Sequence, residues 1–443
     1  MRIKIKEKDI FKKIIKRNFN KEIKKIDSFC LDSRLLEKND IFLCLNGKKF
    51  NPHNILPEIL KKNPSLVFSE KKINDERVVL IDSSKDTLLK LAKDWMSFFN
   101  IPIIAITGSN GKTTTKEMLV EIFKSKYKIN YSKGNYNSLI GLPVNAFEFS
   151  LNADYTIIEM GASKPNEINE LCKIFKPDSS LITNIHEAHI GNFNSFDDLI
   201  KTKTAIFKKT DINGLIFENL DDINIKNFCA KIKNKISFSF KNKEVDFYGL
   251  WKNENGKKIF FINDERIYNQ NLNDIMAKNI IASYAIASSK GISHNQIIDI
   301  LKRFNFLKGR GQIIKRNGYL IVDDTYNANF ESFKAGINSF MKLSHKGRKI
   351  LVIGDMKELG KKAKDIHIHL GNYIVDQSPD IVYSFGELIS YTSRQLFDSN
   401  INTRHFKKFS EMIKDIKLNI IKGDAIYFKA SRSLEFEKII NTI

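Results

Sequence analysis

The sequence predicts an α/β protein of three domains, on the basis of its length and of two separate alternations of strand-like and helix-like segments. The chain has 443 residues, which is about three times a typical domain length. Short apolar runs alternate with helical segments over residues 101–310, and a second alternation starts near Tyr319. Such runs are typical of parallel strands covered by helices on both faces. We expect a small α/β domain over residues 1–98, a central parallel-sheet domain over 99–310 and a third α/β domain over 311–443.

Each domain has its own predicted strands. The first domain has strand candidates at 40–45 and 65–68 and is predicted to end in a helix over 89–99. The central domain has predicted strands at 101–106, 155–158, 180–183 and 214–217, then β-like segments at 236–240, 245–251 and 258–262 and a helix over 274–290. The third domain has predicted strands at 319–322, 349–353, 381–385 and 425–428.

The net charge is +22, from 73 Lys and Arg against 51 Asp and Glu. A charge of this size raises nucleic acid or an anionic membrane as a partner. The excess is almost all lysine and is distributed along the whole chain, whereas phosphate recognition favours arginine. No apolar run approaches the roughly 18 residues that a membrane helix needs. We therefore interpret the charge as solvated surface, and we expect no nucleic-acid partner and no stable membrane insertion.

Cysteine usage and the N-terminal residues both indicate a cytoplasmic protein. Cys30, Cys44, Cys172 and Cys229 lie far apart without a CxxC spacing, which argues against a disulfide framework or a zinc site. Charged residues interrupt the apolar residues of segment 1–19, so this segment lacks the apolar core of a secretory signal.

The sharpest local motif is the segment 106–114, Ile-Thr-Gly-Ser-Asn-Gly-Lys-Thr-Thr, which follows a predicted strand and precedes a predicted helix. Glycines here let successive N–H groups face a polyphosphate at the positive N-terminus of the helix. Lys112 is expected to reach the terminal phosphates, and the Thr113 hydroxyl is expected to bind Mg²⁺. Because Ile106 replaces the first glycine of the strict phosphate-loop pattern, an ordinary glycine-containing turn is the alternative. The ATP-binding candidates are Gly108, Ser109, Asn110, Gly111, Lys112, Thr113 and Thr114.

Acidic and amide side chains follow two other predicted strands. Glu159 ends the strand at 155–158, where a carboxylate is costly unless it has a partner. The segment 322–329, Val-Asp-Asp-Thr-Tyr-Asn-Ala-Asn, collects two carboxylates and two carboxamides behind the first strand of the third domain. We expect both groups to lie at the carboxyl edges of parallel sheets, where ligands bind.

With these motifs the chain resembles the Mur ligase family of ATP-dependent, amide-bond-forming enzymes over essentially its whole length. Further points of resemblance are segments 31–34, 40–47, 353–360 and 429–433. The resemblance implies a uridine-nucleotide-binding first domain, a P-loop ATPase-like central domain and a Rossmann-like third domain. The Asp-Asp-Thr-Tyr-Asn-Ala-Asn run resembles the family member that joins D-alanyl-D-alanine to UDP-MurNAc-tripeptide.

The resemblance also implies roles for single residues. The expected Mg²⁺ ligands are Thr113, Glu159, His189 and Lys203, and the lysine is often carbamylated in the family. Thr202 and Ala205 depart from the family pattern around that lysine. The expected catalytic residues are Lys112, His189, Lys203 and Arg310, the last being a hinge arginine that contacts nucleotide phosphates.

Adenine recognition in the family uses a His-Asn pair that opens a helix, and this chain has Lys278-Asn279 there. Asn279 is therefore an ATP-binding candidate, with a helix cap as the alternative. Asn135 and Asn137 lie in a loop expected to meet the sugar nucleotide, although a polar surface turn has the same composition. The substrate-binding candidates are Ser33, Arg34, Asn135, Asn137, Asp324, Tyr326, Asn327, Asn329 and Arg432.

The implied activity is ATP- and Mg²⁺-dependent ligation of D-alanyl-D-alanine to UDP-MurNAc-tripeptide for peptidoglycan precursor synthesis. It runs through an acyl phosphate, and the protein is expected to be a monomer. These motifs do not distinguish a tripeptide that ends in meso-diaminopimelate from one that ends in lysine. The alternatives are a folylpolyglutamate synthase or another Mur-type ligase, or a basic P-loop ATPase that binds nucleic acid. The last of these would carry arginine-rich strips interleaved with aromatic residues, which the sequence lacks.

Overall fold

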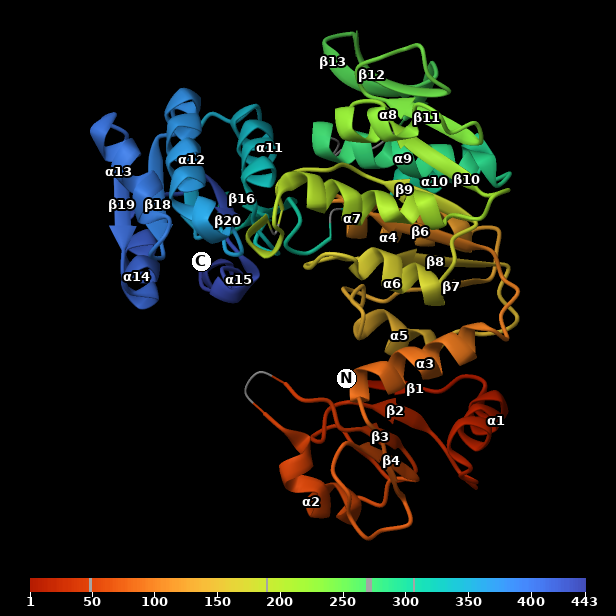
Figure 1. Cartoon of the computed structure of the whole chain (residues 1–443). Coiled ribbons are helices and arrows are strands. Elements are labelled where there is room, and N and C mark those ends of the chain that lie inside the picture. The colour runs from red at the N-terminus through yellow and green to blue at the C-terminus, as the bar shows by residue number, and fades with distance from the viewer. Residues whose placement is uncertain (48–49, 189, 268–272, 306) are drawn as a thin grey trace.

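The structure, a computed structural model, contains three sheets that follow one another along the chain (Figure 1). It describes residues 1–47, 50–188, 190–267, 273–305 and 307–443. The α/β class and the three sheet-containing parts expected from the sequence are confirmed.

The first sheet has the order β1-β2-β3-β4-β5, with β1 antiparallel to β2 and the other pairs parallel. Phe29, Ile41 and Phe68 pack with the apolar faces of α1 and α3, and Phe42 and Val67 pack on the opposite face with α2. The strands are β1 (Arg2–Lys4), β2 (Ser28–Cys30), β3 (Ile41–Leu43), β4 (Leu66–Ser69) and β5 (Val78–Leu80), and the helices are α1 (Lys8–Phe19), α2 (Leu56–Lys61) and α3 (Ser84–Met96).

The central sheet has the order β14-β13-β12-β11-β10-β9-β6-β8-β7. Strands β7 to β12 are parallel to their neighbours, and β13 and β14 extend the sheet in antiparallel fashion. The β-like segments after residue 235 therefore belong to the central sheet. The strands are β6 (Ile103–Thr107), β7 (Ile129–Tyr131), β8 (Tyr155–Glu159), β9 (Ser179–Ile182), β10 (Leu215–Asn219), β11 (Lys235–Ser239), β12 (Phe247–Glu254), β13 (Lys257–Ile262) and β14 (Glu265–Ile267).

Helices cover both faces of the central sheet because its buried strands are apolar on both sides. In β6, Ile104 and Ile106 pack with α4 (Lys112–Lys124), α9 (Asp274–Ser289) and α10 (His294–Leu301). Ile103 and Ala105 face the other side, which is covered by α6 (Glu167–Ile174), α7 (Phe196–Lys209) and α8 (Ile223–Cys229). Successive strand residues point to opposite faces, so a run of apolar residues fills both layers.

The third sheet has the order β15-β16-β20-β17-β18-β19, and only the β15–β16 pair is antiparallel among the strands that the structure describes. Helices α11, α12 and α13 cover one face, and α14 and α15 cover the other. The strands are β15 (Gln312–Arg316), β16 (Tyr319–Asp323), β17 (Lys349–Gly354), β18 (Ile381–Phe385), β19 (Thr403–Phe406) and β20 (Ala425–Lys429), and the helices are α11 (Phe330–Met341), α12 (Ala363–Gln377), α13 (Ser390–Asp398), α14 (Phe409–Asn419) and α15 (Glu437–Ile440).

The predicted strands of the central and third domains are all present, with ends within a few residues of the expected positions. The predicted helix over 274–290 is α9, and the helix expected to close the first domain, α3, ends at Met96 rather than Phe99. The predicted domain limits at 98 and 310 fall in the connections from α3 to β6 and from α10 to β15.

The first and central domains share one continuous apolar core. Phe147, which follows α5 (Gly141–Ala146), meets Phe11 and Phe29 with ring centroids 4.9 Å apart in each pair. The indole N–H of Trp95 donates to Ala146 O at 2.7 Å. The two domains are therefore packed together as one body.

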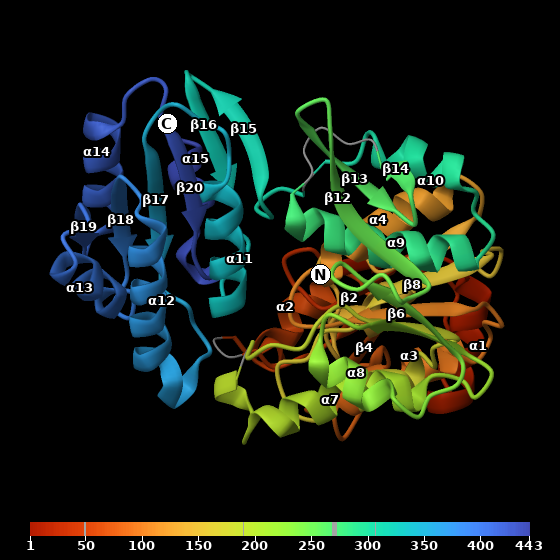
Figure 2. The same cartoon turned by 90° about the horizontal axis from the view of Figure 1, so that it is seen from above.

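The C-terminal domain lies to one side of that body (Figure 1) and meets it through smaller contacts. The turn Ile190–Asn192 reaches from the central domain so that the Ile190 side chain packs in the C-terminal core. Gly191 N donates to Glu358 O at 3.0 Å, and Lys362 pairs with Glu187 at 2.9 Å. Figure 2 shows α11 on the side of the C-terminal domain that is turned toward the central domain.

Two expectations about the whole chain can be compared with the structure. All four cysteines are buried and free, as expected from their spacing, and burial raises the pKa of the Cys44 thiol to about 12. Among the helices that the structure describes, none combines the length and the apolar character that crossing a membrane requires.

Candidate active site

A cleft of about 1110 Å³ lies between the central and C-terminal domains. Its floor is the loop that joins β6 to α4, together with Glu159 at the end of β8. One wall comes from α9 and the hairpin strand β12, and the other comes from α11 and the loop that precedes it. The phosphate loop and the segment 322–329, which are far apart in sequence, therefore face the same cavity.

The two glycines of the phosphate loop are required by its backbone and by its neighbours. Gly108 has φ +145° and Gly111 has φ +83°, which side-chain-bearing residues rarely adopt. A Cβ on Gly108 would lie 1.9 Å from Thr183 Oγ1, and one on Gly111 would lie 2.5 Å from Asn279 Oδ1. The loop can therefore curl against both neighbours only because these two residues have no side chain.

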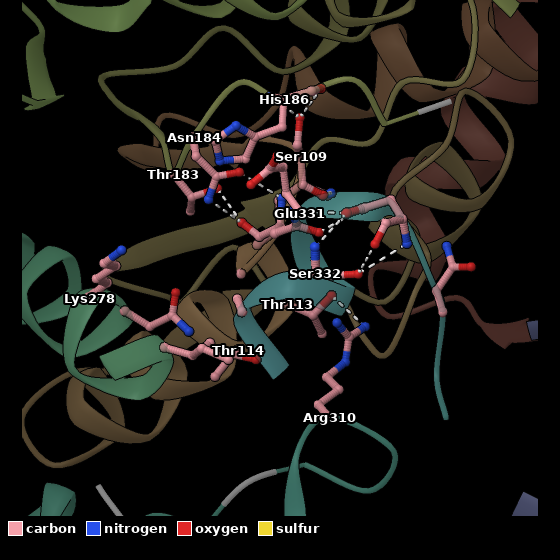
Figure 3. Close-up of a pocket in the computed structure, with 18 of the residues that line it drawn as sticks. Ser109, Thr113, Thr114, Thr183, Asn184, His186, Lys278, Arg310, Glu331 and Ser332 are labelled. Atoms are coloured by element: carbon pink, nitrogen blue, oxygen red, sulfur yellow. Dashed lines mark hydrogen bonds between the residues drawn. The ribbon is translucent and has the colours of Figure 1, made fainter. Parts of the chain in front are cut away.

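Residues that follow β9 hold the phosphate loop in place (Figure 3). Asn110 N donates to Asn184 Oδ1 at 2.9 Å, and the Thr183 hydroxyl donates to Asn110 O at 2.6 Å. Ser109 Oγ donates to His186 O, and His186 N donates back to Ser109 Oγ, both at 2.9 Å. Sequence reasoning did not select Thr183 or Asn184, although they open the same segment in which His189 was selected.

Two lysines, Lys203 buried and Lys112 half-buried, converge on the carbonyl of Gly108. Lys112 Nζ donates to Gly108 O at 2.8 Å and to Ser109 O at 3.0 Å, and Lys203 Nζ donates to Gly108 O at 3.0 Å. Burial lowers the pKa of Lys112, and nearby Arg310 lowers it further while Glu159 opposes the shift. Burial and the charge of Lys112 lower the pKa of Lys203 to about 7. Desolvated cations of this kind favour a polyanionic ligand.

Glu159 connects the strand end to the phosphate loop. Its carboxylate is 1% exposed and accepts hydrogen bonds at 2.7 Å from the Thr113 hydroxyl and from Asn137 Nδ2. Arg310 Nη2 also reaches Thr113 Oγ1, at 3.0 Å (Figure 3). Within the described ranges no three His, Cys, Asp or Glu side chains form a cluster that could hold a metal alone. When phosphates supply oxygen ligands to Mg²⁺, the protein commonly adds only one or two, and one carboxylate with one hydroxyl matches that number.

The connection between the central and C-terminal domains contributes Arg310 through a braced loop. The Arg310 guanidinium carbon lies 3.8 Å from the centroid of the Tyr326 ring. Asp323 Oδ1 accepts from Thr325 N and Oγ1, and Asp323 Oδ2 accepts from Gly309 N. Arg310 and, through Asn329, the 323–329 segment both contact the phosphate loop.

Asp324 belongs to a buried group that the sequence did not reveal. Its Oδ2 accepts hydrogen bonds at 2.7 Å from the Lys429 ammonium and from the Tyr427 hydroxyl. Burial raises the pKa of Tyr427 well above its usual value. Lys429 is 2% exposed and lines the cleft, so it joins the candidate site. It is the first residue of the 429–433 segment that also contains Arg432.

Asn279 is not a helix cap. Asn273 caps α9, and Asn279 lies within the helix, where its side chain accepts from Thr115 Oγ1 at 3.3 Å and lies against Gly111. The cap alternative is therefore wrong, and contact with the phosphate loop explains the residue. Lys278 and Trp251 line the cleft beside it.

Some predicted site residues line the cleft and others do not. The residues that line it are Ser109, Asn110, Gly111, Lys112, Thr113, Thr114, Asn135, Asn137, Glu159, Lys203, Asn279, Arg310, Asp324, Tyr326, Asn327 and Asn329. Arg34 pairs with Asp32 and its side chain is 85% exposed, while the neighbouring Ser33 accepts from Lys62 through its carbonyl. Arg432 pairs with Glu437. His189 lies outside the described residues.

Comparison with known proteins is consistent with this site. Residues 106–287 match the family described as Mur ligase middle domain, and residues 309–432 match the one described as Mur ligase, glutamate ligase domain. The chain is similar to the UDP-N-acetylmuramoyl-tripeptide–D-alanyl-D-alanine ligases of Buchnera aphidicola subsp. Baizongia pistaciae and Bacillus subtilis. It is 30% identical to the first, over 94% of this chain and 92% of that protein, and 28% identical to the second, over 94% and 93%.

Two solved structures are similar to this one over nearly their whole length. A MurF ligase from Thermotoga maritima in complex with ADP has a TM-score of 0.81 and 29% identity, over 93% of this chain and 96% of that chain. MurF from Acinetobacter baumannii has a TM-score of 0.86 and 25% identity, over 97% and 98%.

We predict that Gly111→Ala strongly weakens ATP binding, because the new Cβ would meet Asn279 Oδ1 at 2.5 Å and the backbone has φ +83°. Calorimetric titration with ATP measures the effect, and we expect at least about a 100-fold weaker affinity, since the loop must move to relieve the clash.

Gly256→Ala is the matched control, because Gly256 has φ +75° in a hairpin turn but nothing within 4 Å of the position that a Cβ would take. It carries the same conformational cost without the clash and should bind ATP normally. If the Gly111→Ala variant and the control bound ATP with equal affinity, a glycine would not be required at position 111.

We predict that Lys203→Met stabilises the nucleotide-free protein, and more so at low pH. The pKa of Lys203 is lowered to about 7 in the folded state, whereas lysine in an unfolded chain titrates near 10.4. The cost of burying the charge is therefore fully present below pH 7 and fades as the pH rises toward about 10.4. We expect a gain on the order of a few kcal/mol at pH 6.5 that shrinks by pH 9.5.

Urea unfolding in carbonate-free buffer at several pH values measures this gain. Lys201→Met, at an exposed position of the same helix, controls for the loss of one charge. A gain that is the same at pH 6.5 and pH 9.5 would show that Lys203 is not buried as a charge.

Proposed function

Because this chain belongs to the Mur ligase family, we propose that it joins D-alanyl-D-alanine to UDP-N-acetylmuramoyl-tripeptide at the expense of ATP, in peptidoglycan precursor synthesis. One observation carries the proposal: a phosphate loop with two lysines, the hinge residue Arg310 and the 323–329 loop face one cleft. Relatives that align over more than nine-tenths of this chain carry the same activity in their names.

The proposed reaction has two steps. The terminal carboxylate of the tripeptide attacks the γ-phosphorus of ATP, the bond to the β–γ bridging oxygen breaks, and ADP leaves an acyl phosphate. The free amine of the dipeptide then attacks the acyl carbon, and the tetrahedral intermediate expels inorganic phosphate and loses the amine proton to form the amide. The work of the protein is to position the reactants and to neutralise charge.

Residues of this chain supply that neutralisation. Lys112 belongs to the phosphate loop, Arg310 reaches the loop from the connection to the C-terminal domain, and the N-terminus of α4 points its N–H groups into the same space. Because Lys112 and Lys203 are desolvated, their charges act at low dielectric on the transferring phosphoryl group.

Mg²⁺ fits the donors present at this site. Glu159 and Thr113 would hold it through one carboxylate and one hydroxyl oxygen, and the preference of Mg²⁺ for oxygen ligands agrees with both. The ion supplies further positive charge to the ATP phosphates when it is bound. His189 remains a proposed ligand on the family resemblance alone.

Lys203 could join the metal ligands as a carbamate. The neutral amine is the form that adds to CO₂, and a pKa of about 7 leaves much of it neutral near physiological pH. The product would be an anion in place of a cation beside Lys112, which relieves the repulsion between the two lysines. These points support the modification that the family resemblance implies.

The remaining predicted residues are proposed substrate contacts. Asn135 and Asn137 line the side of the cleft formed by the loop after β7, where the tripeptide can approach Glu159. Ser33 and Arg34 are proposed to contact the uridine nucleotide, and Arg432 is proposed to contact the dipeptide. Because these three residues do not line the cleft, the substrates must extend beyond it to reach them. Asp324 and Asn327 are proposed at the dipeptide end.

The purified chain should release phosphate when given ATP, Mg²⁺, UDP-MurNAc-tripeptide and D-alanyl-D-alanine together. A coupled phosphate assay and mass spectrometry of the UDP-MurNAc-pentapeptide measure the reaction. Omission of any component should abolish product. If phosphate release required folate and L-glutamate, or single amino acids in place of the dipeptide, the assignment would be wrong.

We predict that Glu159→Gln raises the Mg²⁺ concentration needed for half-maximal activity by at least about 10-fold, because a neutral amide is a poorer Mg²⁺ ligand than a carboxylate. Titration of activity with MgCl₂ measures the change. Glu331→Gln removes one charge from the cleft wall, where Glu331 pairs with Lys334 at 3.5 Å, and should leave the Mg²⁺ requirement unchanged. An unchanged requirement in Glu159→Gln would remove Glu159 from the metal site.

A further inference from the structure

We propose that Tyr326 and Asn329 are positioning residues of the nucleotide site: Tyr326 holds Arg310 over the phosphate loop, and Asn329 holds the Asn110 side chain within it. Asn329 acts across the boundary between the central and C-terminal domains, and Tyr326 acts on the connection between them. The consequence is that ATP binds tightly only when the C-terminal domain is docked. This inference rests on the proposed function for its choice of ATP as ligand.

The loop that carries both residues is anchored firmly in the C-terminal domain. Asp323 is 2% exposed and ties the start of the loop to Thr325 and to Gly309 N. Asp324 is held at 2.7 Å by Lys429, which also donates to Asn327 O at 3.1 Å. Because these groups are bonded within the domain, the loop moves with the domain rather than independently.

Tyr326 fixes the side chain of Arg310, whose backbone is itself held in place. Arg310 N donates to Leu307 O at 2.9 Å, and Gly311 N donates to Asp323 O at 2.8 Å. Tyr326 N donates to Gly309 O at 2.9 Å, and its ring lies 3.8 Å from the guanidinium carbon. With the plane of the guanidinium held on the ring, Nη2 reaches Thr113 Oγ1 at 3.0 Å. The stacking therefore aims the arginine at the phosphate site.

Asn329 makes a reciprocal amide pair with the phosphate loop. Its Nδ2 donates to Asn110 Oδ1 at 2.8 Å, and Asn110 Nδ2 donates to Asn329 Oδ1 at 3.3 Å. The backbone of Asn110 is already held by Thr183 and Asn184, so the side chain is the part that Asn329 controls. Asn329 Oδ1 also caps α11 by accepting from Ser332 N at 2.9 Å. The phosphate loop is thus tied to the first turn of a C-terminal helix.

These contacts change the roles expected for residues 323–329, the segment predicted to lie near the substrates. The ring of Tyr326 and the amide of Asn329 are occupied by nucleotide-site residues, which leaves Asp324, Asn327 and Lys429 to face the dipeptide end of the cleft. Linkage then requires that docking of the domain and binding of nucleotide favour each other by the same factor.

The first test compares Tyr326→Leu with Tyr326→Phe, because phenylalanine keeps the ring and leucine removes it. Calorimetric titration of the full chain with Mg²⁺ and adenylyl imidodiphosphate is the readout. We expect about a 10-fold weaker Kd for the leucine variant, the size of a partly desolvated cation–π contact, and a Kd within about twofold of the parent for the phenylalanine variant.

The second test uses Asn329→Ser, because serine is also a good helix N-cap but is too short to reach Asn110. We expect an unchanged melting temperature and several-fold weaker binding of the same analogue. In a double-mutant cycle, Asn110→Ala should weaken binding much less in the Asn329→Ser background than in the parent chain.

Steady-state kinetics separates this role from direct contact with the dipeptide. A rise in KM for ATP with an unchanged KM for D-alanyl-D-alanine supports positioning. A higher KM for the dipeptide with unchanged analogue binding, equal loss in the leucine and phenylalanine variants, or full additivity in the cycle would overturn it. If no ligation occurs with any dipeptide but the analogue titrations follow the expected pattern, the proposed function fails and the positioning roles stand.

Discussion

The structure depends on the concentration of positive charge around the carbonyl of Gly108. Lys112, which is half-buried, and Lys203, which is buried, both donate to that oxygen, and Arg310 approaches Thr113 from the connection to the C-terminal domain. Burial lowers the pKa of both lysines because the charged form is poorly solvated there. Three cations that repel one another at low dielectric are best satisfied by a polyanion. The glycines of the loop, the carboxylate of Glu159 and the hinge all serve to make room for that ligand and to hold it.

The division of the chain into one body and one attached domain follows from the sizes of its interfaces. The first and central domains share a core in which Phe147 contacts rings from the first domain. The C-terminal domain meets them through polar pairs such as Asn110 with Asn329, and through a few apolar side chains, with Ile190 buried in the C-terminal core and Phe193 and Phe196 packed against it. Small polar interfaces are typical of domains that move relative to each other. An enzyme that must admit two substrates and then exclude water needs such a boundary at its active site.

Much of the fold and part of the site could be predicted from the sequence, for local reasons. Continuous apolar runs identified the strands of the central and third sheets, because a strand that is buried on both faces needs apolar residues at nearly every position. The phosphate loop was visible because its glycines, lysine and threonines lie within nine residues. The ends of elements, such as α3 stopping at Met96, depend on packing that the local sequence does not fix. The β-like segment predicted at 258–262 is β13, which pairs with its sequence neighbours β12 and β14. Lys429 and Thr183 were missed because their partners, Asp324 and Asn110, lie 105 and 73 residues away.

The sequence by itself determined which chemical groups this protein has, namely a loop built to bind phosphate, a carboxylate at a strand end and a run of acids and amides behind another strand. It determined them because each is a short segment whose spacing is set by the backbone. Only the tertiary structure decided what each group does. Asn279 lies inside a helix against Gly111 instead of capping it, and Arg432 pairs with Glu437 outside the cleft. Tyr326, predicted as a substrate contact, has its ring against the Arg310 guanidinium. These outcomes depend on how the elements pack in three dimensions, which the spacing of residues along the sequence does not fix.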